Sequence, residues 1–179
     1  MRKIVLTFGL IAGVILAIVM WVVATLCEKN IIPLDKTETI GYASMVIALS
    51  MVFFGVKSFR DNLNRGHIKF WKAMQVGILI TLVASLMYAI SGEVYYQVNP
   101  DLVRSFMEKY VEHETVKLKE KGASQEEIDR VHRQAVDMMK LNENMLVRFG
   151  IALIEILPIG IIVTLVSAAI LRKRELLPA

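Results

Sequence analysis

Four apolar blocks limit what this chain can fold into. They cover residues 4–26, 40–56, 73–91 and 149–171, and they are too long for the helices of a soluble core. At about 1.5 Å per residue, each block can cross a hydrocarbon layer about 30 Å thick, although the second only just does so. Hydrophobic residues make up 55% of the chain, and its mean hydropathy is +0.53. The sequence therefore predicts an all-α integral membrane protein with a four-helix bundle.

The first block has the positive start of a signal peptide, with Arg2 and Lys3 at its beginning. Its apolar run is longer than a signal peptide needs, and no small-residue cleavage pattern follows it. We therefore expect an uncleaved first helix. Cys27 is the single cysteine, so neither a disulfide within one chain nor a cysteine-based zinc site can form.

Basic residues near the ends of the blocks predict the orientation in the membrane. Lys and Arg in short loops are enriched on the cytoplasmic side. One side of the predicted bundle would hold ten basic and two acidic residues, whereas segment 99–148 has nine basic and ten acidic residues. We therefore expect both termini and the loop 57–72 to be cytoplasmic. The expected organisation is three spans in 1–98, an external segment in 99–148, and the fourth span with a short basic tail in 149–179.

The external segment carries the start and stop signals of two helices. Asn99 can cap a helix that has Pro100 in its first position, and Gly122 can end that helix. Ser124 and Glu127 have the spacing of a capping box at the start of a second helix. Apolar residues recur at helical spacing in both stretches. The segment is therefore predicted to be a solvated helical hairpin between the third and fourth spans.

An acidic residue, Glu155, interrupts the fourth block within the stretch FGIALIEILPIG. A charge in hydrocarbon is costly unless a partner offsets it, so intramembrane acids are candidates for a functional site. Pro158 removes the backbone hydrogen bond to Ile154 and predicts a kink one turn beyond the acid. Glu93, at the outer end of the third block, is a second acid that we expect at a neighbouring depth.

Three functions remain open for these polar groups. In the first, Glu155 is neutral or hydrogen-bonded to facing helices, and the protein is a non-enzymatic structural, interaction or adaptor protein. In the second, Glu155 and Glu93 form the site of a small proton- or cation-coupled transporter or channel component. In the third, the external hairpin senses a partner in the envelope and passes a helix shift inward. We adopt the first interpretation.

Two other residue pairs are weaker candidates, one for metal binding and one for helix packing. His113 and His132 lie at similar distances from the predicted hairpin turn and would form a weak metal pair if they faced each other. The more ordinary interpretation is that they are polar residues at helix edges. Gly9 and Gly13 form a GxxxG pair in the first block, which allows close helix packing within the bundle or between subunits.

The loop between the second and third blocks mixes basic and aromatic residues. Aromatic rings favour the depth of the lipid headgroups, and basic groups are attracted to anionic lipid. We therefore expect this loop to contact membrane lipids, rather than to bind a cytoplasmic protein. The predicted contact residues are Lys57, Arg60, Arg65, Lys69, Trp71 and Lys72.

No nucleophile–base set, metal-ligand cluster or phosphate-binding loop is visible in the sequence, so we expect neither enzyme activity nor a cofactor. The net charge of +4 reflects basic residues at membrane ends and gives no reason to expect nucleic-acid binding. The expected partners are anionic lipid headgroups, together with a second copy of the chain or a membrane or periplasmic protein.

Four short motifs carry a resemblance to a known family. They are GYASM in the second block, FFGVKSFRDN after it, GEVYY after the third block and LIEILPIG in the fourth. In this order the chain resembles the bacterial membrane-protein family called domain of unknown function 4199 (DUF4199), over nearly its whole length. The resemblance implies a multi-pass protein of the bacterial inner membrane. It implies no activity, substrate or catalytic residue.

Overall fold

The computed structural model describes residues 1–172, except the side chains of Leu102 and Val103. This part of the chain is all-α, as the sequence predicted. Lys173, Arg174 and the rest of the predicted tail lie outside the described residues. The helices are α1 (Arg2–Glu28), α2 (Leu34–Leu63), α3 (Phe70–Val98), α4 (Pro100–Glu120), α5 (Gln125–Asn142) and α6 (Met145–Leu171).

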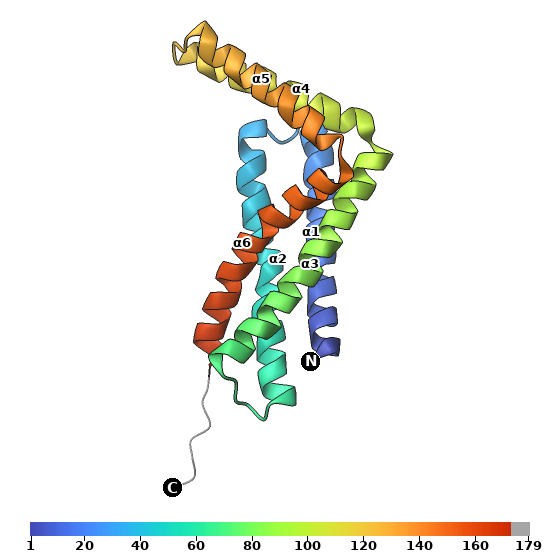
Figure 1. The fold of residues 1–179 in the computed structure, drawn as a ribbon, viewed down its shortest axis with the longest axis vertical. Helices are drawn as coiled ribbons and strands as arrows, with labels where there is room; N and C mark the ends of the chain where they lie inside the picture. Colours follow the sequence, from blue (N-terminus) through green and yellow to red (C-terminus); the bar gives the residue numbers. More distant parts are fainter. Residues whose placement is uncertain (173–179) are drawn as a thin grey trace.

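The four long helices α1, α2, α3 and α6 form an elongated bundle, and α4 and α5 form a hairpin at one end of it (Figure 1). Within the described residues, these four are long and apolar enough to cross a membrane. They contain the four predicted blocks. The second block, which was barely long enough, is part of a helix of 30 residues. The chain is a membrane protein with four candidate spans.

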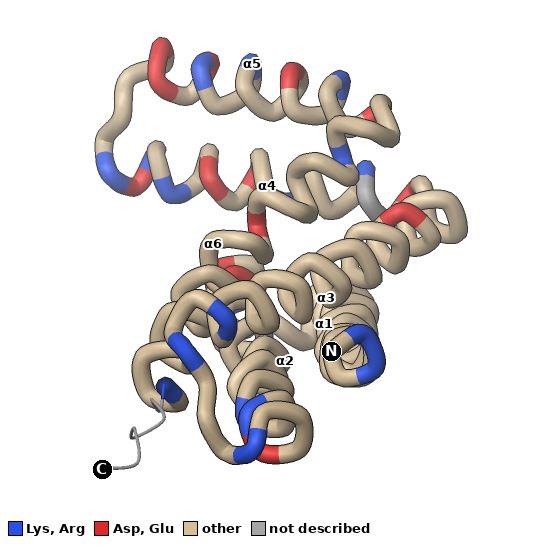
Figure 2. Tube along the Cα trace, turned by 60° about the horizontal axis from the view of Figure 1, so that its bottom comes forward, with Lys and Arg blue, Asp and Glu red and all other residues tan. Residues whose placement is uncertain are grey.

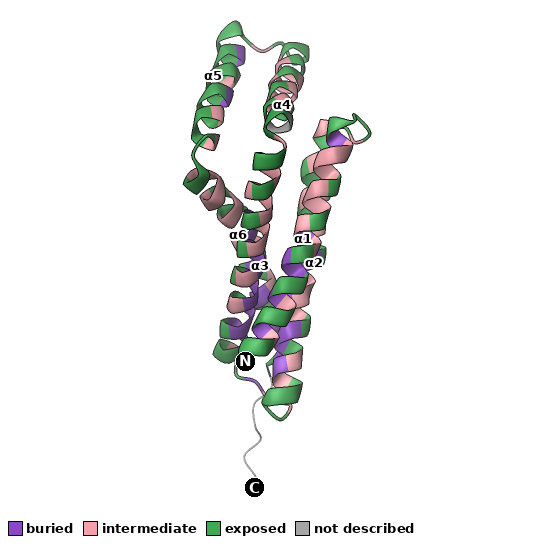
Figure 3. Cartoon of the chain, turned by 90° about the vertical axis from the view of Figure 1, so that its right-hand side faces the viewer, coloured by how far each residue is buried: buried purple, intermediate pink, exposed green. Residues whose placement is uncertain are grey.

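The bundle has two unlike halves. We call the half next to the N-terminus and the loop 64–69 the loop half, and the half next to α4 and α5 the hairpin half. The residues that are buried gather in the loop half and the middle of the bundle (Figure 3). The largest fully buried apolar side chains are Leu49, Val52, Val56, Ile68, Val76, Ile80 and Ile156. The apolar core therefore holds together the ends of the helices that lie away from the hairpin.

Small residues bring α3 and α6 into close contact. The two helices are antiparallel, so Thr164 of α6 covers Gly77 of α3, and Thr81 of α3 covers Gly160 of α6. A Cβ atom on Gly77 would lie 2.6 Å from Thr164 Cγ2, and one on Gly160 would overlap Thr81 in the same way. Backbones that approach this closely gain packing contacts, which drive helix association in lipid.

The predicted GxxxG pair packs inside the chain. A Cβ atom on Gly9 would lie 2.6 Å from Val83 Cβ, and one on Gly13 would lie 2.5 Å from Met87 Cβ. Both neighbours belong to α3. The two glycines therefore let α1 approach α3 within one bundle.

The hairpin has the helix signals that the sequence predicted, with one difference. Ser124 and Glu127 form a reciprocal capping box, and Gly122 has a φ of 73°, which favours glycine at the turn. Asn99 occupies the N-cap position of α4, but its side chain makes no capping bond there. It instead donates to the Tyr95 carbonyl at 3.3 Å and so satisfies the end of α3.

Candidate functional site

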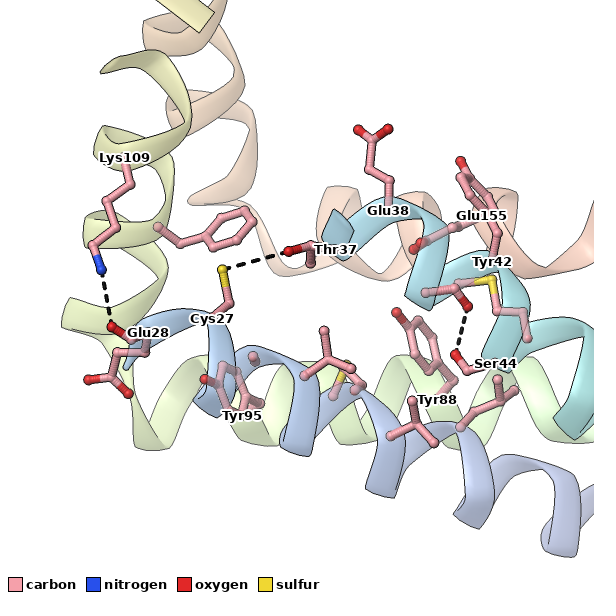
Figure 4. A pocket seen from close by; sticks show the side chains of 18 of the residues that line it. Cys27, Glu28, Thr37, Glu38, Tyr42, Ser44, Tyr88, Tyr95, Lys109 and Glu155 are labelled. Atoms are coloured by element: carbon pink, nitrogen blue, oxygen red, sulfur yellow. Dashed lines mark hydrogen bonds between the residues drawn. The ribbon is translucent and has the colours of Figure 1, made fainter. Parts of the chain in front are cut away.

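A pocket of about 480 Å³ lies in the hairpin half of the bundle (Figure 4). The residues around it come from α1, α2, α3, α4 and α6. Its surface is mostly apolar, although hydroxyl and charged side chains from all five helices also contribute to the lining. A pocket of this size and lining is typical of sites for small organic molecules.

Glu155 lies at the end of the pocket that is farther from the hairpin. It comes from α6, and Tyr88 of α3 and Tyr42 of α2 lie beside it (Figure 4). The Tyr88 hydroxyl is directed toward the Glu155 side chain (Figure 4). The Glu155 side chain is accessible from the pocket rather than sealed in the core. The acid therefore has a hydroxyl neighbour and open space in front of it.

The opposite end of the pocket is closed by the first hairpin helix. Lys109 of α4 donates to the Glu28 carbonyl oxygen at 3.1 Å and to Asn30 Oδ1 at 3.0 Å. Thr37 Oγ1 donates to Cys27 Sγ at 3.7 Å, so α1 and α2 are also joined here (Figure 4). Because Lys109 binds neutral oxygens at the end of α1, its ammonium group is directed away from Glu155.

Aromatic contacts hold the α3 wall of the pocket. The Tyr95 ring packs edge-on against Trp21 of α1, with the ring centroids 5.1 Å apart. The Trp21 indole also donates to Ser91 Oγ at 3.0 Å. These contacts fix α1 against α3 and leave the Tyr95 side chain on the pocket surface.

The bend of α6 accounts for the open space. The helix changes direction along its length, and Pro158 lies inside it (Figure 1). Proline cannot donate to the carbonyl of Ile154, one turn earlier, and its ring crowds that turn, which bends a helix. Beyond the bend, α6 lies tightly along α3. Before Pro158, α6 carries Glu155, which lines the pocket.

Glu93 does not share the pocket with Glu155, although the sequence suggested a joint site. Its carboxylate forms two hydrogen bonds with Arg148 of α6, at 2.8 Å and 2.7 Å. The Arg148 guanidinium also lies 3.8 Å from the centre of the Tyr96 ring and donates to the Asn142 carbonyl. The two charged side chains are only 10% and 15% exposed. This ion pair joins α3 to α6 at the base of the hairpin.

The two hairpin histidines contact different neighbouring side chains. His113 lies 3.8 Å from the Glu114 carboxylate, and His132 Nε2 lies 3.2 Å from Thr115 Oγ1. Among the described residues, no group of three His, Cys, Asp or Glu side chains could hold a metal ion. His132 lines a groove between α4 and α5, and His113 does not.

The predicted lipid-contact residues lie at the loop end of the bundle. Trp71 is 79% exposed and packs edge-on against Phe70 at the start of α3. Arg60 pairs with Asp61 at 2.6 Å, and Lys72 donates to Gln75 at 2.9 Å. Contact between these side chains and lipid headgroups stays a prediction.

Sequence reasoning missed several residues that shape the site. Tyr42, Tyr88 and Lys109 line the pocket, and Arg148 forms an ion pair with Glu93. A tyrosine in an apolar helix does not by itself indicate a binding site. The bend of α6 decides which faces of the helices line the pocket, and the sequence does not show it. A usable signal did exist for the α3–α6 contact, since Gly-xxx-Thr occurs in both helices, at 77–81 and 160–164.

Comparison with known proteins identifies the family of this chain. No curated protein matches it, and neither does any solved structure. A family model described as Protein of unknown function (DUF4199) matches residues 7–173, which is nearly the full length. The resemblance carried by the four sequence motifs is therefore confirmed, and the chain belongs to the DUF4199 family.

Proposed function

We propose that this protein is a non-enzymatic interaction protein of the bacterial inner membrane. In this proposal the four long helices form a membrane bundle, the loop half faces the cytoplasm, and the hairpin binds a partner protein outside. The observation that carries the proposal is the groove between α4 and α5, which we call the hairpin groove. The lack of a nucleophile–base set or phosphate-binding loop in the sequence supports a role without catalysis.

The charge distribution supports this orientation. Lys and Arg gather at the loop end of the bundle, whereas both signs of charge alternate along the hairpin (Figure 2). An excess of basic residues near span ends favours the cytoplasmic side, where they meet anionic headgroups. The described basic residues at the loop end are Arg2, Lys3, Lys57, Arg60, Arg65, Lys69, Lys72 and Arg172.

The hairpin groove has the chemistry of a protein-binding surface. Its volume is about 550 Å³, and Met107, Val111 and Met139 are among the apolar residues that line it. Val116 and Val136 are 49% and 50% exposed along the same groove. The lining also includes charged and polar residues, which are Glu108, Glu112, Thr115, Lys119 and His132. An apolar groove with a polar rim suits the apolar face of an amphipathic helix.

Two contacts support the view that the hairpin is held at its base. Lys109 binds the end of α1, and the Glu93–Arg148 ion pair binds α3 to the start of α6. A hairpin fixed in this way presents its groove in a defined direction, which lowers the ordering cost of binding. The long bundle would then act as the membrane scaffold for a rigid recognition arm.

Site-specific photocross-linking in native membranes tests the groove. A cross-linking amino acid at position 116 should give a discrete protein adduct, whereas the same group at position 133, an exposed residue outside the groove, should not. Val136→Asp should remove the adduct at position 116, because a charge on the lip opposes apolar docking. Equal adducts from positions 116 and 133, or adducts with lipid alone, would contradict the proposal.

Cysteine labelling tests the orientation separately. After Cys27→Ser, a cysteine at position 120 in the hairpin should react with a membrane-impermeant maleimide added from outside the inner membrane. A cysteine at position 65 should react only after the cytoplasmic face is opened. Labelling of position 120 from the cytoplasmic face alone would reverse the proposed topology.

A further inference from the structure

The pocket in the hairpin half points to a second binding function, which does not rest on the partner proposed for the hairpin groove. We infer that this pocket binds an apolar organic molecule that carries a single positive charge. Two observations support this inference. Acids outnumber bases in the lining of the pocket, and most of its surface is apolar.

The acids in the lining favour a positively charged ligand. Glu28, Glu38 and Glu155 are the acids around the pocket, and Lys109 is the one basic residue that lines it within the described part of the chain. The Lys109 ammonium already binds the Glu28 carbonyl and Asn30. A cation near Glu155 would therefore gain an opposite charge, whereas an anion or a fatty acid would face a carboxylate in a region of low dielectric.

The position of Glu155 selects where the charged group would sit. Its carboxyl lies between Tyr42 and Tyr88 at the bundle-facing end of the pocket (Figure 4). Tyrosine rings attract organic cations through their negative faces, and this attraction is stronger where water is excluded. The carboxyl and the two rings together form a receptor for an ammonium, phosphonium or similar group.

The remaining wall selects the body of the ligand. Leu16, Val19, Met20 and Val23 follow α1 along the pocket, and Met45 and Phe106 face it from α2 and α4. These apolar side chains cannot replace the water shell of a small hydrated ion, and Glu93 does not line the pocket beside Glu155. A volume of about 480 Å³ instead suits a molecule of drug size, which the apolar wall would contact over most of its surface.

The pocket also connects the bundle to the hairpin. Ser105, Phe106 and Lys109 of α4 line its outer end, while Glu155 lies at its inner end. A ligand that fills the pocket would contact both parts of the molecule at once. Occupancy would therefore stabilise the observed position of α4 against the bundle.

A pair of probes with the same shape and opposite charge tests the inference. The protein is reconstituted in nanodiscs of zwitterionic phosphatidylcholine, and binding of tetraphenylphosphonium and tetraphenylborate is measured by equilibrium dialysis against empty nanodiscs. We expect saturable binding of tetraphenylphosphonium at about one site per chain, and no saturable binding of tetraphenylborate. Equal binding of both probes, or no saturable binding of the cation above empty nanodiscs, would overturn the inference.

Two variants locate the binding to this pocket. Glu155→Gln keeps the shape of the side chain but loses its charge, and should weaken tetraphenylphosphonium binding about tenfold or more. Gly41 lines the pocket, and a Cβ atom there meets nothing within 4 Å, so Gly41→Leu should fill the space and block the probe without disturbing the fold. Glu120→Gln and Gly150→Leu are the matched controls outside the pocket, and both should bind as the wild type does. Unchanged affinity in Glu155→Gln and Gly41→Leu, each with wild-type thermal stability, would rule out this site.

Discussion

The loop half and the hairpin half of the bundle are built from the same four helices, yet they differ in how the helices meet. In the loop half, α3 and α6 approach until a threonine side chain of each helix packs directly on a glycine of the other. In the hairpin half, Gly41 and Gly150 have open space where a side chain would go. A small residue in a membrane helix therefore marks close packing in one place and open space in another.

The bend of α6 lies between the pocket and the close contact with α3. Before Pro158, the helix carries Glu155 toward a pocket, and after it the helix carries Gly160 and Thr164 into α3. Helices in lipid gain little from burying apolar surface, since the surrounding tails are equally apolar. Contact area therefore decides stability, and the half with less contact is free to hold a ligand.

The largest effect should come from filling the close contact in the loop half. Gly160→Ala places a methyl group against Thr81, and we expect it to lower the free energy of unfolding by about 1–3 kcal/mol, as overpacking does. Denaturation by SDS in mixed micelles measures this change. A loss in thermal midpoint should accompany it.

Gly41→Ala in the hairpin half is the matched control. Its new methyl group meets nothing within 4 Å, and alanine favours a helix over glycine by about 0.5–1 kcal/mol. The two substitutions should therefore have opposite signs. If both lowered stability equally, the contrast between the two halves would be wrong.

A smaller effect is expected at the base of the hairpin. A double-mutant cycle with Glu93→Gln and Arg148→Gln should give a coupling free energy of about 1–2 kcal/mol, because the two side chains share two short hydrogen bonds and are mostly shielded from solvent. Either single substitution should also raise amide hydrogen exchange at the start of α4 and the end of α5. Arg104→Gln, which breaks an exposed pair with Glu108 on α4, serves as the control. A coupling near zero would show that the hairpin does not depend on this ion pair.

The smallest effect concerns two buried hydroxyl groups in the loop half. Thr81 Oγ1 and Thr164 Oγ1 have no hydrogen-bond partner among the described residues. Valine has the same shape, so Thr81→Val should raise the free energy of unfolding by up to about 1 kcal/mol by removing an unsatisfied polar group. Ser85→Ala is the comparison, because the Ser85 hydroxyl donates to the Leu82 carbonyl at 3.0 Å and its loss should bring no gain. A clear loss of stability in Thr81→Val would mean that packing alone does not hold this half together.

Local signals in the sequence predicted the elements of the fold well. The apolar blocks predicted the four long helices, and Pro100, Gly122 and the Ser124–Glu127 spacing predicted where the hairpin helices begin and turn. These features depend on residues within a few positions of one another, so one sequence is enough to read them. Glu155 could also be singled out, because a lone acid in an apolar block is conspicuous.

Only the tertiary structure decided what these residues contact. Glu93 and Glu155 look alike in the sequence, yet Glu93 pairs with Arg148, 55 positions away, and Glu155 faces a pocket beside Tyr88. Likewise, Gly9 and Gly160 are covered by α3, while Gly41 is not covered at all. Such outcomes depend on how each helix is rotated, tilted and bent against its neighbours. Every apolar side of a helix is nearly equivalent in lipid, so hydrophobicity alone does not fix that rotation, and the shapes of contacting side chains do.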